Sequence, residues 1–207
     1  MNALVDTGPA VVMPSHLPAA PHARKRERSA YLGMAIFLGT WTMMFAGLFF
    51  SYAVVRNDAP TWPPIGEPRL PIGLPALNTL LLLGSSATLA KGLKRLRTGR
   101  ATAFPGWLAA TIVLGVLFLA LQIHVWLSVS EGGLHASTGI YGSVFYGLTC
   151  FHALHVIAGL VILGAIAVPA FAGRNLTARY NLVRLSAMFW HFVDVVWVVM
   201  FVTVYVL

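Results

Sequence analysis

Apolar residues in this chain gather into long runs that are separated by short polar segments. Five of the runs are long enough to cross a bilayer as a helix, which takes about 20 residues. These runs are residues 31–55, 74–93, 107–129, 140–171 and 182–207. The alternating pattern of a membrane β-barrel is absent, and a helix satisfies its own backbone hydrogen bonds in lipid. The pattern therefore predicts an all-α polytopic membrane protein, a bundle of five transmembrane helices.

Composition agrees with this prediction and argues against a soluble domain and against a nucleic-acid-binding protein. Only 10% of the 207 residues are charged, whereas a soluble domain carries about 25%. The net charge of +8 could suggest a nucleic-acid partner, but the basic residues cluster between the apolar runs, as topology signals do. We therefore expect no nucleic-acid partner. The single cysteine, Cys150, excludes an internal disulfide and a cysteine-based metal cluster, and we expect it to be a small buried apolar residue.

The distribution of Lys and Arg predicts the orientation of the helices. Twelve of the fourteen lie before the first run, at or beyond the end of the second, or around the connection between the fourth and the fifth, and only Arg56 and Arg69 lie on the opposite side. The positive-inside rule then places the N-terminus in the cytoplasm and Leu207 in the periplasm. Residues 1–29 are rich in Pro and Ala and end in a basic run, which predicts a disordered cytoplasmic tail before a transmembrane domain at residues 30–207.

The apolar runs contain few ionisable side chains. His191 and Asp194 lie three residues apart in the fifth run, and His152 and His155 lie three apart in the fourth, so each pair shares one side of a helix. An ionisable group in a bilayer core costs about 2.5–3.5 kcal/mol on insertion scales, so it usually faces a partner or a polar cavity. These four residues are therefore the candidate site.

Three interpretations of the candidate site stay open. In the first, His152, His155 and His191 ligate a haem or a metal, with Asp194 as a further ligand or a support. In the second, which the residues favour, the same four side chains form a buried structural network between the fourth and fifth runs. In the third they belong to a proton path, although one carboxylate is too few for a pump. We expect no catalytic residue, because carboxylate pairs, Ser/His/Asp arrangements and phosphate-binding glycine loops are absent.

Several segments resemble one known family. Residues 189–197, Phe-Trp-His-Phe-Val-Asp-Val-Val-Trp, resemble the terminal-helix signature of subunit III of the haem–copper (cytochrome c) oxidases. Residues 139–145 and 149–159 are similar to two stretches of that family's preceding helix, and the resemblance covers nearly everything from Gly33 to Tyr205. The single residues that carry it best are Trp62, Asn78, Gln122, Tyr141, Gly142, Trp190 and Trp197.

The resemblance implies a short five-helix bacterial form of this subunit, without the two N-terminal helices of the seven-helix version. Family members bind neither haem nor copper, which lie in partner subunits. They pack against catalytic subunit I, with subunit II and small helical subunits as further partners, and they hold phospholipid in a cleft. The expected function is therefore that of a non-catalytic accessory subunit of a respiratory terminal oxidase in the bacterial cytoplasmic (inner) membrane. Such a subunit supports assembly, lipid binding and stability in aerobic electron transport, with cytochrome c or quinol as the electron donor.

Three departures from the family pattern keep alternatives open. Trp41 and Val125 stand where the family usually has glutamates, and Arg184 or a neighbour stands where another is common. Without these acids, proton transport by the chain itself loses support. One alternative is the equivalent subunit of a nitric oxide reductase-type complex. Another, of a different class, is a haem- or metal-binding membrane enzyme.

Overall fold

The computed structural model describes residues 21–64, 70–174, 176 and 179–206. Its elements in this part of the chain are all helical. They are α1 (Pro21–Asp58), α2 (Gly73–Arg97), η1 (Ala101–Ala103), α3 (Phe104–Glu131), α4 (Ile140–Phe171), α5 (Tyr180–Met200) and η3 (Phe201–Val206). η1 is a 3₁₀ turn before α3, and η3 continues α5 as a π-helical turn. Five helical segments are long and apolar enough to cross a membrane, which confirms the predicted fold class.

The first helix begins earlier than the sequence pattern predicts. Residues 21–29 were expected in a disordered tail, but α1 begins at Pro21. Proline suits the first position of a helix because its φ is already helical. Between it and Gly33 the chain has no further Pro or Gly, and its Ala, Arg, Lys and Glu residues are good helix formers. The rest of the expected tail, residues 1–20, lies outside the described residues.

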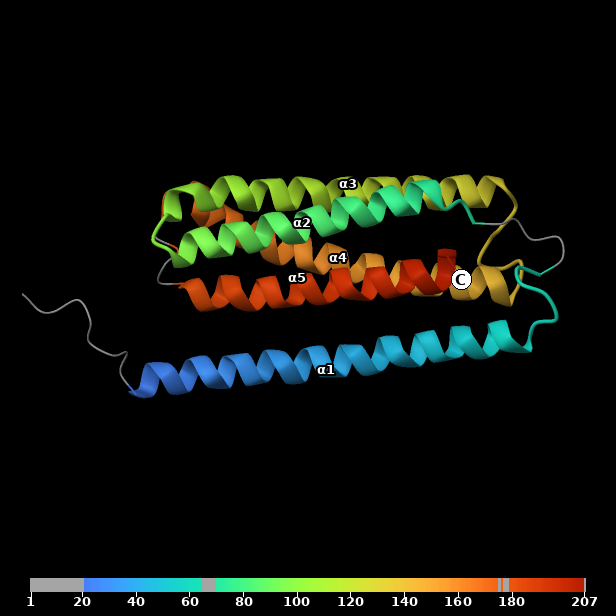
Figure 1. Ribbon diagram of the computed structural model, residues 1–207, viewed down its shortest axis with the longest axis horizontal. Coiled ribbons are helices and arrows are strands. Elements are labelled where there is room, and N and C mark those ends of the chain that lie inside the picture. Colours follow the sequence, from blue (N-terminus) through green and yellow to red (C-terminus); the bar gives the residue numbers. More distant parts are fainter. Residues whose placement is uncertain (1–20, 65–69, 175, 177–178, 207) are drawn as a thin grey trace, which may run out of the picture.

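Helices α2 to α5 form a bundle, and α1 lies along one side of it against α4 and α5 (Figure 1). α1 touches the bundle sparingly: of its side chains from residue 25 onward, Phe45 and Tyr52 are the buried ones. Polar contacts hold α1 at both ends. Asn181 donates a hydrogen bond to Glu27 at 2.8 Å, and Arg56 donates one to the carbonyl oxygen of Thr203 at 3.4 Å.

The indole of Trp190 occupies the centre of the bundle. The residue is 0% exposed and its ring lies between glycines of two other helices. A Cβ on Gly115 of α3 would come within 2.8 Å of the ring, and one on Gly159 of α4 would come within 2.7 Å. Small residues allow close helix packing in membranes. Here two glycines together make room for one large aromatic side chain of α5.

Candidate functional site

One face of α2 carries many of the polar side chains that lie inside the bundle. We call it the α2 polar face. Its residues are Asn78, Thr79, Ser85, Ser86 and Thr88, and they recur at helical spacing, so they point toward α3 and α5. Asn78 and Ser85 are 0% exposed. A buried polar group needs a hydrogen-bond partner to offset its desolvation, and the neighbouring helices provide them.

Three side chains of α5 bind the α2 polar face. The indole N–H of Trp197 donates to the Thr79 hydroxyl at 3.0 Å, and that of Trp190 donates to the Ser85 hydroxyl, also at 3.0 Å. His191 forms its hydrogen bond through Nδ1 with the hydroxyl of Ser86. These three bonds follow one another along the two helices. Together they join α5 to α2 along much of the length of both helices.

Two other residues of the α2 polar face bind α3. The Asn78 amide donates a hydrogen bond to the Gln122 side-chain oxygen at 3.3 Å, and the hydroxyls of Thr88 and Thr111 are 2.9 Å apart. α2 is therefore the helix through which α3 and α5 are tied together by side-chain hydrogen bonds. The resemblance to a known family points to Asn78 and Gln122, whereas the sequence pattern predicts no role for Ser86.

Asp194 lies one turn beyond His191, as its spacing predicted. Its side chain is 3% exposed, and neither carboxyl oxygen completes a hydrogen bond. The Ser86 hydroxyl is close enough to act on this carboxyl group, and the same hydroxyl hydrogen-bonds His191. His191 and Asp194 therefore share one neighbour, but that neighbour belongs to α2 and not to α4.

The two histidines of α4 have different surroundings. His152 is 1% exposed and neither ring nitrogen has a hydrogen-bond partner. Its ring packs against Phe118 and Trp197, with centroids 5.9 and 5.1 Å away. His155 faces α1: its ring centroid is 4.2 Å from that of Trp41, and Nδ1 lies 2.6 Å from the carbonyl oxygen of Phe151.

Among the described residues, no hydrogen bond joins the four candidate residues to one another. In the same part of the chain no three His, Cys, Asp or Glu side chains converge on a point where they could hold a metal ion. His152 faces the inside of the bundle, whereas His155 faces α1. The arrangement is that of separate buried contacts between helices.

Three further residues that carry the resemblance, Trp62, Tyr141 and Gly142, pack where the α1–α2 connection meets the start of α4. The ring of Trp62 contacts those of Tyr52 and Tyr141, with centroids 5.6 and 4.9 Å away. Gly142 lies against the backbone of the α3–α4 connection, where a Cβ would collide with the carbonyl oxygen of His135. These contacts close one end of the bundle.

The three positions where the resemblance implies acids carry an indole, a buried valine and a guanidinium. Trp41 packs edge-to-face on His155, and Val125 is 0% exposed. The guanidinium of Arg184 lies over the ring of Tyr31, 5.2 Å from its centroid. Trp41 and Arg184 thus contribute to the contact of α1 with the bundle.

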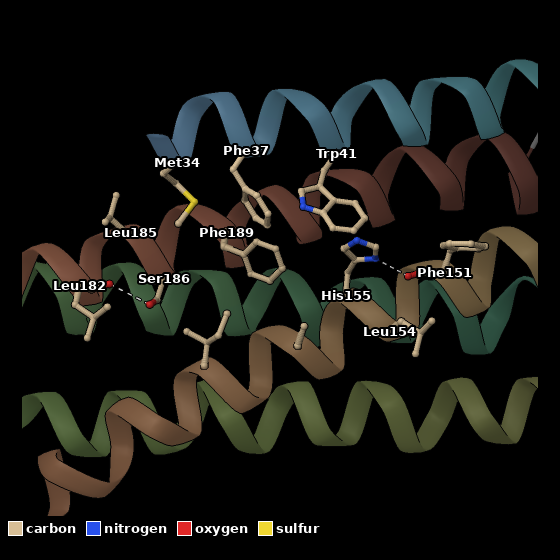
Figure 2. A pocket seen from close by; sticks show the side chains of 12 residues that line it. Met34, Phe37, Trp41, Phe151, Leu154, His155, Leu182, Leu185, Ser186 and Phe189 are labelled. Atoms are coloured by element: carbon tan, nitrogen blue, oxygen red, sulfur yellow. Dashed lines mark hydrogen bonds between the residues drawn. The ribbon is translucent and has the colours of Figure 1, made fainter. Parts of the chain in front are cut away.

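A pocket of about 570 Å³ lies between α1, α4 and α5. Figure 2 shows Met34, Phe37 and Trp41 pointing into it from α1 and Phe189 from α5. The other lining residues are Phe151, Leu154, His155, Ala158, Ile162, Leu182, Leu185 and Ser186. The Ser186 hydroxyl is bonded within its own helix, to the carbonyl oxygen of Leu182 at 3.0 Å. The wall is apolar, so the pocket suits hydrocarbon.

The bundle and its interior contacts can be compared with known proteins. Residues 11–207 match the family described as Cytochrome c oxidase subunit III. The chain belongs to this family. Subunit III membership confirms the resemblance found in the sequence, and it makes the chain an accessory subunit of a haem–copper oxidase, in a complex with other oxidase subunits.

Three similar proteins are each named Cytochrome c oxidase subunit 3. The one from Synechocystis sp. is 36% identical over 176 residues, which cover 84% of this subunit III chain and 74% of the relative. The one from Thermostichus vulcanus is 32% identical and the coverage is 91% and 92%. The one from Corynebacterium diphtheriae is 31% identical, with 90% and 94% covered. Together with the five membrane-spanning helices, these relatives make the chain a multi-pass membrane protein.

Proposed function

We propose that this chain is the non-catalytic subunit III of a respiratory terminal oxidase in a bacterial cytoplasmic (inner) membrane. In that complex it packs against catalytic subunit I, which holds haem and copper, beside subunit II and small helical subunits. The observation that carries the proposal is the family match over residues 11–207 on a five-helix membrane fold. The basic residues support an orientation with the N-terminus in the cytoplasm and the C-terminus in the periplasm.

The interior polar residues support a structural role. In the described part of the chain, the bonds of the α2 polar face connect helices to one another. We assign His191 and Asp194 to the contact of α5 with α2, His152 to the aromatic packing inside the bundle, and His155 to the contact with α1. Each contributes to the contact of its own helix with one or more neighbouring helices. This is the contribution that an accessory subunit makes to assembly.

The pocket between α1 and the bundle is where this subunit would hold phospholipid. It opens between membrane-spanning helices and its wall is apolar. An acyl chain gains free energy by filling such a space, at about 0.8 kcal/mol for each buried CH₂ group. Lipid in this pocket would join α1 to the bundle through hydrocarbon contacts that the protein itself does not make.

Purification of the complex through an affinity tag on this chain tests the proposal. We expect a haem-containing catalytic subunit to co-purify, and we expect the chain expressed alone to show no haem absorption band and no stoichiometric metal. A haem band from the isolated chain would instead support the membrane-enzyme alternative. The activity of the co-purified catalytic subunit decides between an oxygen reductase and a nitric oxide reductase. A tagged chain that brings down no catalytic subunit would overturn the proposal.

A further inference from the structure

A second hollow, of about 610 Å³, lies where α2 ends and α3 begins. We call it the basic cup. Its lining residues are Lys91, Lys94, Arg95, Thr98, Arg100 and Trp107. Four of the six are cations. From residue 73 to residue 131 the sequence contains one carboxylate, Glu131, at the far end of α3. No acid in α2, α3 or the turn between them can therefore neutralise the cup.

The turn after α2 brings the cations together. Gly99 has a φ of 78°, in the left-handed region that glycine adopts without strain. The backbone N–H of Arg100 bonds to the carbonyl oxygen of Arg95 at 3.0 Å, and that of Gly99 bonds to the carbonyl oxygen of Leu96 at 3.4 Å. This pair of bonds is the Schellman ending of a helix, which reverses the chain. Arg100 is thereby turned back toward the lysines on the last turns of α2.

The cup also has an apolar floor. The amine of Lys91 lies over the indole of Trp107, 5.6 Å from the ring centroid, a favourable cation–π geometry. Tryptophan is enriched at the level of the lipid headgroups. From Lys91 toward the middle of α2, helical spacing places Ala87, Gly84 and Leu80 on one stripe. Leu80 is 67% exposed. The cationic cup therefore continues into exposed apolar surface within the span.

Basic residues at a helix end are usually explained as topology signals, but that explanation requires no particular geometry. Arg97 shows the difference, because it lies in the same last turn of α2 and does not line the cup. A site that combines converging cations, a tryptophan at the membrane edge and a neighbouring apolar stripe fits a ligand with a phosphate and a hydrocarbon chain. Neither inorganic phosphate nor an acidic protein segment would use the apolar stripe.

We propose that the basic cup binds the phosphate headgroup of an anionic phospholipid, with one acyl chain along the Ala87–Leu80 stripe. This site is separate from the pocket beside α1, whose wall is mostly apolar and contains no lysine or arginine. Its cations select the lipid by charge. Zwitterionic lipid, in which the phosphate is already neutralised, binds there weakly.

Native mass spectrometry of the purified, delipidated complex tests the site, with phosphatidylglycerol as the probe. At about 0.5 M salt the screening length is only a few ångströms, so diffuse attraction is suppressed and contact binding persists. We expect Lys94→Gln/Arg95→Gln to weaken the binding of one phosphatidylglycerol by about 30-fold, on the order of fivefold for each cation removed. Arg97→Gln removes a charge from the same turn and is expected to change binding less than about twofold. The charge-preserving Lys94→Arg/Arg95→Lys is expected to restore it.

Three further experiments distinguish an anionic lipid in the basic cup from a free anion or an acidic protein segment. Phosphatidylcholine is expected to bind equally to the wild type and the double variant, and inorganic phosphate at the lipid's concentration is expected not to displace phosphatidylglycerol. Displacement by inorganic phosphate would assign the cup to the free anion. A zero-length amine–carboxylate cross-link from Lys94 to another subunit would assign it to an acidic protein segment. Either result, or equal phosphatidylglycerol binding by wild type and double variant, overturns the proposal.

Discussion

The indole N–H of Trp190 donates a hydrogen bond to the hydroxyl of Ser85, 3.0 Å away and fully buried. The bond joins α5 to α2 at the centre of the bundle, where the indole ring also contacts α3 and α4. Removal of the hydroxyl by Ser85→Ala leaves a buried N–H without a partner, which costs about 1–3 kcal/mol. We expect the complex to dissociate at a lower temperature, as measured by thermal dissociation in detergent.

Two further variants make that prediction specific. Ser128→Ala removes a hydroxyl that bonds only within its own helix, to the carbonyl oxygen of His124 at 3.0 Å on an exposed face, and should leave the dissociation temperature unchanged. Combined with Trp190→Phe, Ser85→Ala should cost little more, because the unpaired donor is gone. Additive losses in the double variant would mean that the bond contributes nothing.

The glycines beside Trp190 give a second prediction. Gly159→Ala places a methyl group 2.7 Å from the indole ring, which is rigid and cannot move aside. Overpacking of this kind costs about 1–3 kcal/mol, and less of the assembled complex should be recovered. Gly164→Ala is the matched control on the same helix, since a Cβ there meets nothing within 4 Å. Equal recovery of the two variants would contradict the packing described for Trp190.

The bond between His191 and Ser86 gives a third prediction. His191→Leu removes the partner of the Ser86 hydroxyl and a contact between α5 and α2. Hydrogen bonds between membrane helices contribute about 0.6 kcal/mol on average, so we expect a modest loss of assembled complex. The haem absorption spectrum of what does assemble should stay unchanged. His124→Leu, at an exposed position of α3, is the control, and a shifted haem band in His191→Leu would show that the residue acts on the catalytic centre.

The pocket between α1 and the bundle gives a fourth prediction. Ala158 lines this pocket, and Ala158→Phe puts a ring into the space that we assign to an acyl chain. The purified complex should then retain less phospholipid after a detergent wash, as counted by lipid phosphorus. Ala120→Phe adds the same ring to an exposed position of α3 and should retain the wild-type amount. Unchanged retention in Ala158→Phe would exclude this pocket as the lipid site.

The sequence predicts the membrane-spanning helices well, but it predicts poorly which side of each helix faces another helix. The reason is physical. Uninterrupted apolar runs define membrane helices by length alone, so five helices follow directly. The same runs are apolar on all sides, so they do not reveal which side faces protein. Cys150 was expected to be buried, yet it is exposed on the outer surface of α4. In lipid, an apolar side chain gains nothing by turning inward.

Spacing predicts that His191 and Asp194 share one side of α5, but spacing cannot identify the helix opposite. We expected α4 there, and the structure has Ser86 of α2. For His152 and His155, three residues of helical rotation were enough to send one ring inward and the other toward α1. The space that holds the Trp190 ring could not be predicted either. Gly115 and Gly159, which border it, lie far apart in the sequence and become neighbours only in the folded bundle.

α1 is fastened to the bundle at its two ends, by Glu27 with Asn181 and by Arg56 with Thr203, and encloses a pocket between them. Between these ends α1 contacts the bundle through aromatic rings, Phe37 against Phe189 and Trp41 against His155. This face of α1 also borders the pocket. Hydrocarbon that fills the pocket would therefore set how closely the middle of α1 can approach α4 and α5.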